Sequence, residues 1–182
     1  MFRKLFVLAI LIMLNLSAIY GLDAYLHRND VIKSADTAEK TPDFTWRDFD
    51  GKTHNIAELK GHIVVIHFWA TWCAPCRKEF PELLAAAKAL GDNVIFLTIS
   101  GDDELAPAKK FVENAEQKSG TKNLANVLYA LDDNKHIAID IFQTAVYPES
   151  IVLDANQNMR RKFGGAIEWQ DANVMDYLKQ LK

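Results

Sequence analysis

The sequence predicts an α/β fold in which a central mixed sheet carries helices on both faces. Three observations lead to this prediction. Residues 63–69 form a run of β-branched and aromatic side chains, which is typical of a strand buried on both faces. A helix-forming stretch at 74–90 and a second apolar run at 94–99 follow, and this order predicts a parallel strand pair with a right-handed crossover. Residues 150–163 contain two short apolar segments around a turn, which indicates a hairpin.

The elements before the first buried strand are small. Residues 44–46 and 53–55 flank an Asp-Gly pair at 50–51, and this dipeptide favours the tight turn of a hairpin. Ile56–Leu59 then predicts a single helical turn that ends at Gly61. We therefore expect a short hairpin and one turn of helix to lead into the central strand.

The stretch 74–90 has strong helix signals. Its second half is rich in alanine and leucine, which have high helix propensity, and Gly91 is a typical helix terminator. Pro81 lies inside the stretch and predicts a kink, because proline lacks the backbone N–H that a helix interior uses.

The second half of the chain supplies the remaining elements. Pro107 is expected in the first turn of a helix that runs to about Lys118, with Phe111 and Val112 on its inner side. The later segments are a loop at 120–126, a strand at 127–131, a short helix or apolar turn at 137–142, the hairpin, and a closing helix with the apolar stripe Val174, Tyr177, Leu178 and Leu181.

Composition limits the classes of function. The chain has 182 residues and a net charge of −3, which argues against a nucleic-acid partner and against electrostatic binding to an anionic surface. Its two cysteines are too few for a disulfide scaffold, and each has one obvious partner, the other cysteine.

The N-terminal residues predict a membrane anchor. Residues 1–4 include two basic side chains and are expected to be cytoplasmic, and the apolar run 5–22 is long enough to span a membrane once. A cleaved signal peptide and a buried core helix are the alternatives, although the run lacks a good small-x-small cleavage site. The polar residues 23–41 are expected to form a linker, which leaves 42–182 as the exported domain.

Cys73 and Cys76 form a Cys-x-x-Cys pair at the predicted start of the helix. Such a pair can bind structural zinc, attach haem, exchange disulfides or remain two inert buried thiols. Zinc normally needs four Cys or His ligands, whereas the five histidines are scattered singly, and haem attachment needs a His where this chain has Arg77. The redox interpretation is favoured, and it requires neither a metal nor a cofactor.

The predicted helix start also suggests a role for each thiol. Cys73 would face unpaired backbone N–H groups and the positive end of the helix dipole, which favour the attacking thiolate. Cys76, one turn inside, would resolve the mixed disulfide that Cys73 forms with a partner. Ala74 leaves the Cys73 sulfur reachable, and Pro75 restrains the loop.

Four segments of the chain match the sequence pattern of a known family. They are Pro42-Asp-Phe44, Asp50-Gly-Lys52, Leu59-Lys-Gly61 and Phe68-Trp-Ala-Thr-Trp-Cys-Ala-Pro-Cys-Arg-Lys-Glu-Phe-Pro81. Through them the sequence resembles the membrane-anchored TlpA/ResA/DsbE branch of the thioredoxin superfamily, over roughly residues 42–182. The resemblance implies a thioredoxin-like fold and a protein of the bacterial inner membrane whose domain faces the periplasm or cell exterior. It also implies a protein that reduces disulfides of apocytochrome c or of other exported proteins and is re-reduced by a membrane thiol donor.

The resemblance implies roles for three further residues. Pro148 matches the family's cis-proline, which packs beside the dithiol and pairs with the substrate backbone; an ordinary trans turn proline is the alternative. Tyr147 precedes it, at a position that tunes partner access. Glu79 matches an acidic residue near the dithiol that could exchange a proton with Cys76 if burial raises its pKa; the alternative is a solvated surface charge.

His67 is a departure from the family, which commonly has Asn or Asp at this position. It could relay a proton for Cys76, since an imidazole titrates near neutral pH, or it could be a neutral core histidine. Trp72 is expected to pack around the site and to screen Cys73 from solvent.

Two alternative functions remain within the same superfamily. A thiol peroxidase would need a Pro-x-x-x-Thr-x-x-Cys approach, whereas Thr71 lies only two residues before Cys73. A copper-binding assembly module would use a Cys pair spaced one residue wider with a distant His, for which His136 is the candidate.

Overall fold

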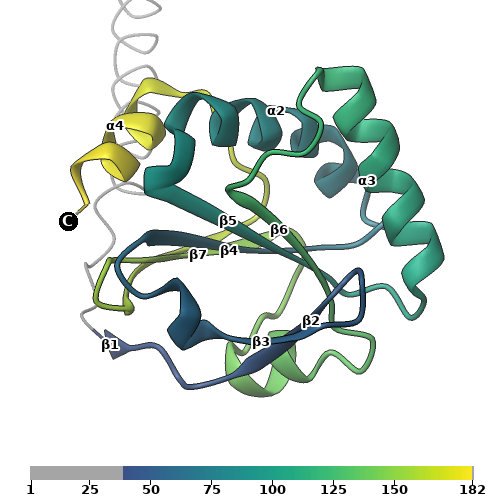
Figure 1. The fold of residues 1–182 in the computed structure, drawn as a ribbon, viewed down its shortest axis with the longest axis horizontal. Coiled ribbons are helices and arrows are strands. Elements are labelled where there is room, and N and C mark those ends of the chain that lie inside the picture. Colours follow the sequence, from purple (N-terminus) through teal and green to yellow (C-terminus); the bar gives the residue numbers. More distant parts are fainter. Residues whose placement is uncertain (1–38, 182) are drawn as a thin grey trace, which may run out of the picture. The chain divides into compact units, whose positions relative to one another are not determined.

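An eight-stranded mixed sheet forms the centre of the protein (Figure 1). The computed structural model describes residues 39–181. The strands are β1 (Glu39–Lys40), β2 (Thr45–Asp48), β3 (Thr53–Asn55), β4 (Ile63–Trp69), β5 (Val94–Ser100), β6 (Val127–Leu131), β7 (Glu149–Leu153) and β8 (Asn158–Gly164). The helices are η1 (Ile56–Leu59), α2 (Ala74–Leu90), η2 (Gly91–Asn93), α3 (Leu105–Ser119), η3 (His136–Ile141) and α4 (Ala172–Gln180). Across the sheet the strands lie in the order β1-β8-β7-β4-β5-β6-β2-β3.

The strand β4 is central, as its apolar sequence predicts. All seven of its residues are buried, and it pairs in parallel with β5 and antiparallel with β7. The parallel crossover through α2 and the β7–β8 hairpin are therefore both confirmed. The β2–β3 hairpin is confirmed as well.

The two faces of the sheet are covered differently. Apolar side chains of α2, α3 and α4 pack in one cluster with Val65 and Phe96. Val64 and Ile66 alternate to the opposite face, where they pack with the short helices η1 and η3 and with Trp46. The three long helices thus share one face, and Figure 1 shows them together above the sheet.

The sheet also includes a strand inside the segment expected to be a linker. Glu39 and Lys40 of β1 pair with Met159 and Asn158 at the outer edge of β8. Both residues of β1 are exposed and polar, so their sequence does not predict a strand. They form one because they pair with the open edge of β8.

The segment at 137–142 is a π-helical turn. The Phe142 N–H donates to the Ile137 carbonyl at 3.1 Å, and the buried Asp132 carboxylate accepts the N–H groups of Ile137 and Ala138. The proline predicted inside the first long helix is there: α2 includes Pro81 and continues to Leu90.

The anchor expected at 5–22 and the cytoplasmic residues 1–4 lie outside the described residues. Within residues 39–181, no helix combines the length and apolarity needed to span a membrane.

Candidate active site

Cys73 and Cys76 are joined by a disulfide at the N-terminus of α2, directly after β4. Their Cα atoms are 5.3 Å apart, because Cys73 caps α2 and Cys76 lies in its first turn. Cys73 is the N-cap residue, and its sulfur accepts the Cys76 N–H at 3.2 Å. Cys73 is 6% exposed and Cys76 is fully buried, so Cys73 is the more accessible residue of the pair.

The residues between and before the cysteines lie at the surface. Ala74 and Pro75, the two residues between the cysteines, are exposed. Trp72 is 65% exposed, and its indole stacks on the Tyr147 ring at a centroid distance of 5.6 Å. The bond between Tyr147 and Pro148 is cis, which confirms the predicted isomer. The stacked pair brings the 147–148 segment next to the dithiol.

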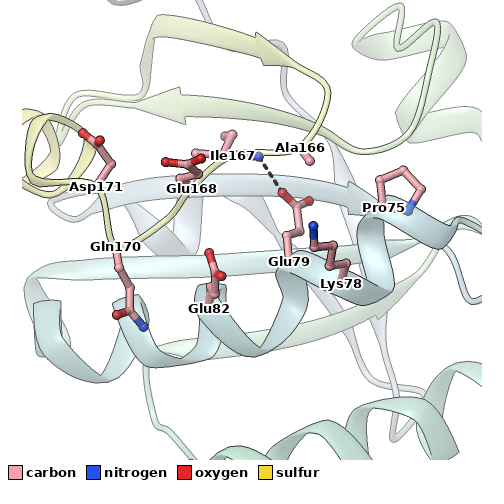
Figure 2. Close-up of a pocket in the computed structure, with 9 residues that line it drawn as sticks. All are labelled: Pro75, Lys78, Glu79, Glu82, Ala166, Ile167, Glu168, Gln170 and Asp171. Carbon is pink, nitrogen blue, oxygen red and sulfur yellow. Dashed lines mark hydrogen bonds between the residues drawn. The ribbon is translucent and has the colours of Figure 1, made fainter.

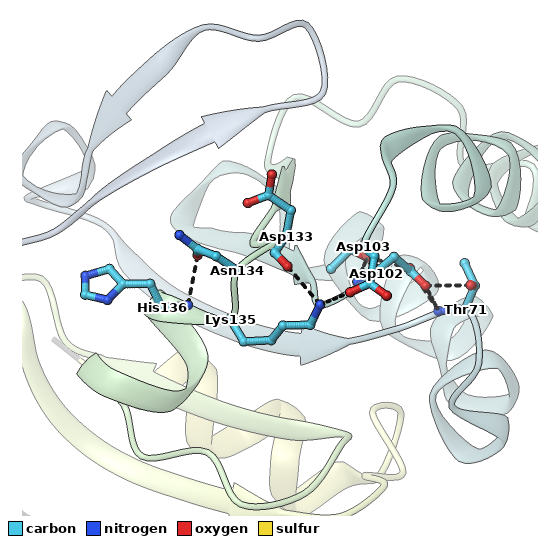
Figure 3. A network of polar contacts seen from close by, with 8 residues as sticks. Thr71, Asp102, Asp103, Asp133, Asn134, Lys135 and His136 are labelled. Atoms are coloured by element: carbon cyan, nitrogen blue, oxygen red, sulfur yellow. Dashed lines mark hydrogen bonds and ion pairs between the residues drawn. The ribbon is translucent and has the colours of Figure 1, made fainter.

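The turn that leads into the dithiol is held by Asp102, a residue that sequence analysis did not identify. Its buried carboxylate accepts the Thr71 N–H at 3.0 Å and the Thr71 hydroxyl at 2.6 Å (Figure 3). The Ser100 hydroxyl donates to the same carboxylate at 2.6 Å. The sequence does contain a signal for Asp102. It follows β5, which is parallel to β4, so the segments after both strands lie at the same edge of the sheet.

Glu79 lies one turn beyond Cys76 and is only 4% exposed. Its Oε2 accepts the Ile167 N–H at 2.7 Å (Figure 2), and its Oε1 lies 3.4 Å from His67 Nε2. Burial raises the pKa of Glu79 from 4.5 to about 7, and the nearby Glu82 charge adds to the shift against the opposing Ile167 hydrogen bond. The side chain is therefore not a solvated surface charge.

His67 is fully buried on β4, between Glu79 and Ser150. Its Nδ1 lies 2.8 Å from the Ser150 hydroxyl on the neighbouring strand β7, and the Trp169 ring stands edge-on to the imidazole at 5.9 Å. Burial lowers the pKa of His67 to about 3. The imidazole is therefore neutral at physiological pH, and its contact with Glu79 is not a pair of opposite charges.

A groove connects Glu79 with the surface beside the dithiol (Figure 2). It has a volume of about 680 Å³ and lies between α2 and the segment 166–171. Pro75 and Glu79 are part of its wall, so the buried carboxyl has a route to solvent at the active-site end. Its other lining residues are Lys78, Glu82, Ala166, Ile167, Glu168, Gln170 and Asp171.

His136, the candidate for a distant metal ligand, begins η3. Its Nδ1 lies 2.8 Å from an Asp140 oxygen in the same helix, and its backbone N–H donates to the Asn134 side chain (Figure 3). The neighbouring Lys135 ammonium pairs with Asp103.

Proteins of similar sequence are named as thiol-disulfide oxidoreductases or as thioredoxin-like proteins. The chain is 27% identical over 175 residues to thiol-disulfide oxidoreductase ResA of Bacillus cereus, which covers 94% of each chain. It is 28% identical over 116 residues to thioredoxin-like protein YneN of Bacillus subtilis, and the match covers 64% of each.

Solved structures establish the fold. The thioredoxin domain of a thiol-disulfide oxidoreductase from Bacteroides vulgatus superposes with a TM-score of 0.60 at 20% identity, covering 81% of this chain and 98% of that one. The exposed lipoprotein thioredoxin Etrx1 of Streptococcus pneumoniae gives a TM-score of 0.59 at 24% identity, covering 77% and 100%. The protein therefore has a thioredoxin-like α/β fold.

A known family matches more than half of the chain. Residues 37–162 match the AhpC/TSA family, and this range contains β4, both cysteines and the cis bond before Pro148. Because that match covers more than half of the sequence and includes its redox pair, the chain belongs to the AhpC/TSA family.

Proposed function

We propose that this protein is an extracytoplasmic thiol–disulfide oxidoreductase that reduces disulfides of exported proteins, such as apocytochrome c. The observation that carries the proposal is the Cys73–Cys76 disulfide at the N-terminus of α2. A pair that closes within one helical turn can accept and release two electrons without a change of fold.

The reaction consists of two exchanges. The Cys73 thiolate attacks one sulfur of the substrate disulfide, a Cys73–substrate disulfide forms, and the second substrate sulfur leaves as a thiolate that takes a proton. The Cys76 thiolate then attacks Cys73, releases the substrate dithiol and closes the enzyme disulfide. A membrane thiol donor reduces that disulfide by the reverse sequence.

The helix start makes Cys73 the attacking thiol. The Cys76 N–H already points at its sulfur at 3.2 Å, and the positive end of the α2 dipole stabilises the same charge. Cys76 has no comparable exposure, which suits a thiol that reacts only with the mixed disulfide.

Glu79 accepts the proton that Cys76 must lose before it attacks. Its raised pKa of about 7 lets it hold or release a proton near neutral pH, and the groove lets that proton exchange with solvent. His67 stays neutral and does not take up the proton. Its role is to position the Glu79 carboxyl through the 3.4 Å contact.

The partner binds over Trp72, Ala74, Pro75, Tyr147 and Pro148. The first three are exposed beside Cys73, and Tyr147 is stacked on Trp72. The chain reaches its partners from the membrane, where the apolar run 5–22 anchors it once and leaves the domain on the outer side.

A thiol peroxidase is the less favoured function. The Thr71 hydroxyl donates to Asp102 at 2.6 Å, so it is committed to holding the turn and does not face a peroxide at Cys73.

The test is to trap the intermediate. Cys76→Ser is expected to accumulate a mixed disulfide between Cys73 and its partner in the bacterial envelope, because the resolving thiol is missing. Cys73→Ser is the matched control and should trap far less. Mass spectrometry of the trapped adduct identifies the substrate and the direction of exchange. Equal trapping by both variants would show that Cys73 is not the nucleophile.

A further inference from the structure

The ring of Tyr147 is held between two features that lie far apart in the sequence. On one side it stacks on the Trp72 indole with an interplanar angle of 20°. On the other it lies against the backbone of Gly101, the residue that follows β5. Tyr147 also packs against both apolar clusters of the protein, so its ring has little freedom to move.

Gly101 is a glycine because of this contact. A Cβ added there would overlap the Tyr147 hydroxyl and lie 2.6 Å from its Cε2 and 2.9 Å from its Cζ. The Gly101 N–H donates to the Trp69 carbonyl at 2.8 Å, which fixes its backbone at the end of β4. Because the atoms that a Cβ would meet all belong to Tyr147, we expect a side chain at position 101 to push the tyrosine ring outward.

The surface that results is apolar and lies beside the dithiol. Trp72 is 65% exposed and Val146 is 59% exposed, and in residues 39–181 only Ile139 is a third large apolar side chain of this kind. Trp72 directly precedes Cys73, and Val146 directly precedes Tyr147. We call the stacked pair Trp72 and Tyr147 the aromatic shelf.

We propose that Gly101 holds the aromatic shelf flat, and that the shelf selects substrates with an apolar side chain next to the reacting cysteine. This inference rests on the proposed function, because it concerns the substrates of the same dithiol. Gly101 is a positioning residue, since it acts through Tyr147.

The occupant of the shelf follows from the reaction. A substrate joined to Cys73 by a disulfide must place the residues that flank its cysteine near Trp72, the exposed neighbour of Cys73. A flat indole paired with a phenol offers apolar area at low conformational cost, which favours an apolar flanking side chain.

The charges around Tyr147 disfavour an acidic neighbour. Burial is the main cause that raises the pKa of Tyr147 to about 12, and the charges of Asp132, Asp102 and Glu149 add to it. The phenol therefore stays neutral, and an acidic substrate side chain would meet three carboxyl groups on the inner side of the shelf.

The experiment compares two short synthetic peptides with one internal disulfide. They differ only in the residue before the first cysteine, leucine in one and serine in the other. With the reduced protein in excess, we expect the second-order rate constant for reduction of the leucine peptide to be about tenfold higher, the lower end of the discrimination that one apolar group provides. Gly101→Ala should reduce this ratio to about one, because Tyr147 no longer lies flat.

Gly164→Ala is the matched control. A Cβ at Gly164 meets nothing within 4 Å, so this variant should keep the tenfold ratio. Acrylamide quenching of tryptophan emission reports the shelf directly, since Trp46, Trp69 and Trp169 are at most 3% exposed. Gly101→Ala should increase quenching in the reduced protein, and Gly164→Ala should not.

A second variant covers the case in which Gly101→Ala does not fold. Trp72→Ala removes an exposed side chain and is expected to lose the preference for leucine as well. Equal second-order rate constants for both peptides with the wild-type protein, or a tenfold ratio that survives in Gly101→Ala or Trp72→Ala, would overturn the inference alone. Failure of the wild-type protein to reduce either peptide would overturn the proposed function and this inference with it.

Discussion

Replacing Glu79 by glutamine tests whether this buried carboxyl titrates near neutral pH. The variant keeps the shape of the side chain and an oxygen that can accept the Ile167 N–H, but it removes the ionisable group. In the folded protein the pKa of Glu79 is raised from 4.5 to about 7 by burial, whereas the unfolded chain keeps the ordinary value. The stability of the wild-type protein must therefore depend on pH through this residue.

The sign of the effect follows from which state binds more protons. Below the unfolded pKa of 4.5, Glu79 is protonated in both states and adds no penalty. As the pH rises, the unfolded chain ionises first, so the folded state loses relative stability until the pH passes its own pKa of about 7. The two pKa values differ by about 2.5, which at about 1.4 kcal/mol per pKa unit corresponds to about 3 kcal/mol. The groove opens Glu79 to solvent, which reduces this figure, so it is an upper value.

The assay is urea unfolding of the oxidised protein between about pH 4 and pH 8. The free energy of unfolding of Glu79→Gln, minus that of the wild-type protein, should rise with pH by up to about 3 kcal/mol. The lowered pKa of His67 acts in the opposite direction, with stability lost as the pH falls from 6.5 towards about 3, and this histidine is present in both proteins. Glu113→Gln, on the exposed side of α3, should give a flat difference. A flat difference for Glu79→Gln too would refute the reasoning.

Two further substitutions test the supports of the site. Ser150→Ala removes the partner of His67 Nδ1 and should cost about 1–3 kcal/mol of unfolding free energy, because a buried polar atom loses its hydrogen bond. Ser150→Thr keeps the hydroxyl and should recover part of that loss; equal losses in the two variants would contradict the role of the hydrogen bond. Thr71→Val removes a hydroxyl donated to Asp102 and should cost about 1–3 kcal/mol in thermal or urea unfolding. Thr53→Val, at an exposed strand position, is its control, and a similar loss there would show that the Asp102 contact is not the cause.

The local order of elements could be predicted from the sequence. The apolar run of β4, the alanine-rich α2 and the hairpin turns are signals that neighbouring residues create, and each produced the expected element. The disulfide pair is equally local, since a spacing of three at a helix start brings the two Cα atoms within range. The cis bond before Pro148 was expected from family resemblance rather than from a local physical signal.

The surroundings of the dithiol depend on contacts between distant segments. Asp102 reaches Thr71 across 31 residues, His67 meets Ser150 across 83, and Glu79 meets the Ile167 N–H across 88. No periodicity in the chain encodes these pairs, because they depend on which strands become neighbours in the sheet.

The protonation states show the same division. The residue types at positions 67 and 79 by themselves indicate a histidine that titrates near neutral pH and a carboxylate that is ionised there. In the folded protein both side chains lie in an interior that disfavours charge, which lowers the pKa of His67 to about 3 and raises that of Glu79 to about 7. The sequence by itself thus determined the redox pair and the elements that carry it. Only the tertiary structure decided that Glu79, and not His67, has a pKa near neutral pH, because burial is a property of the packed chain.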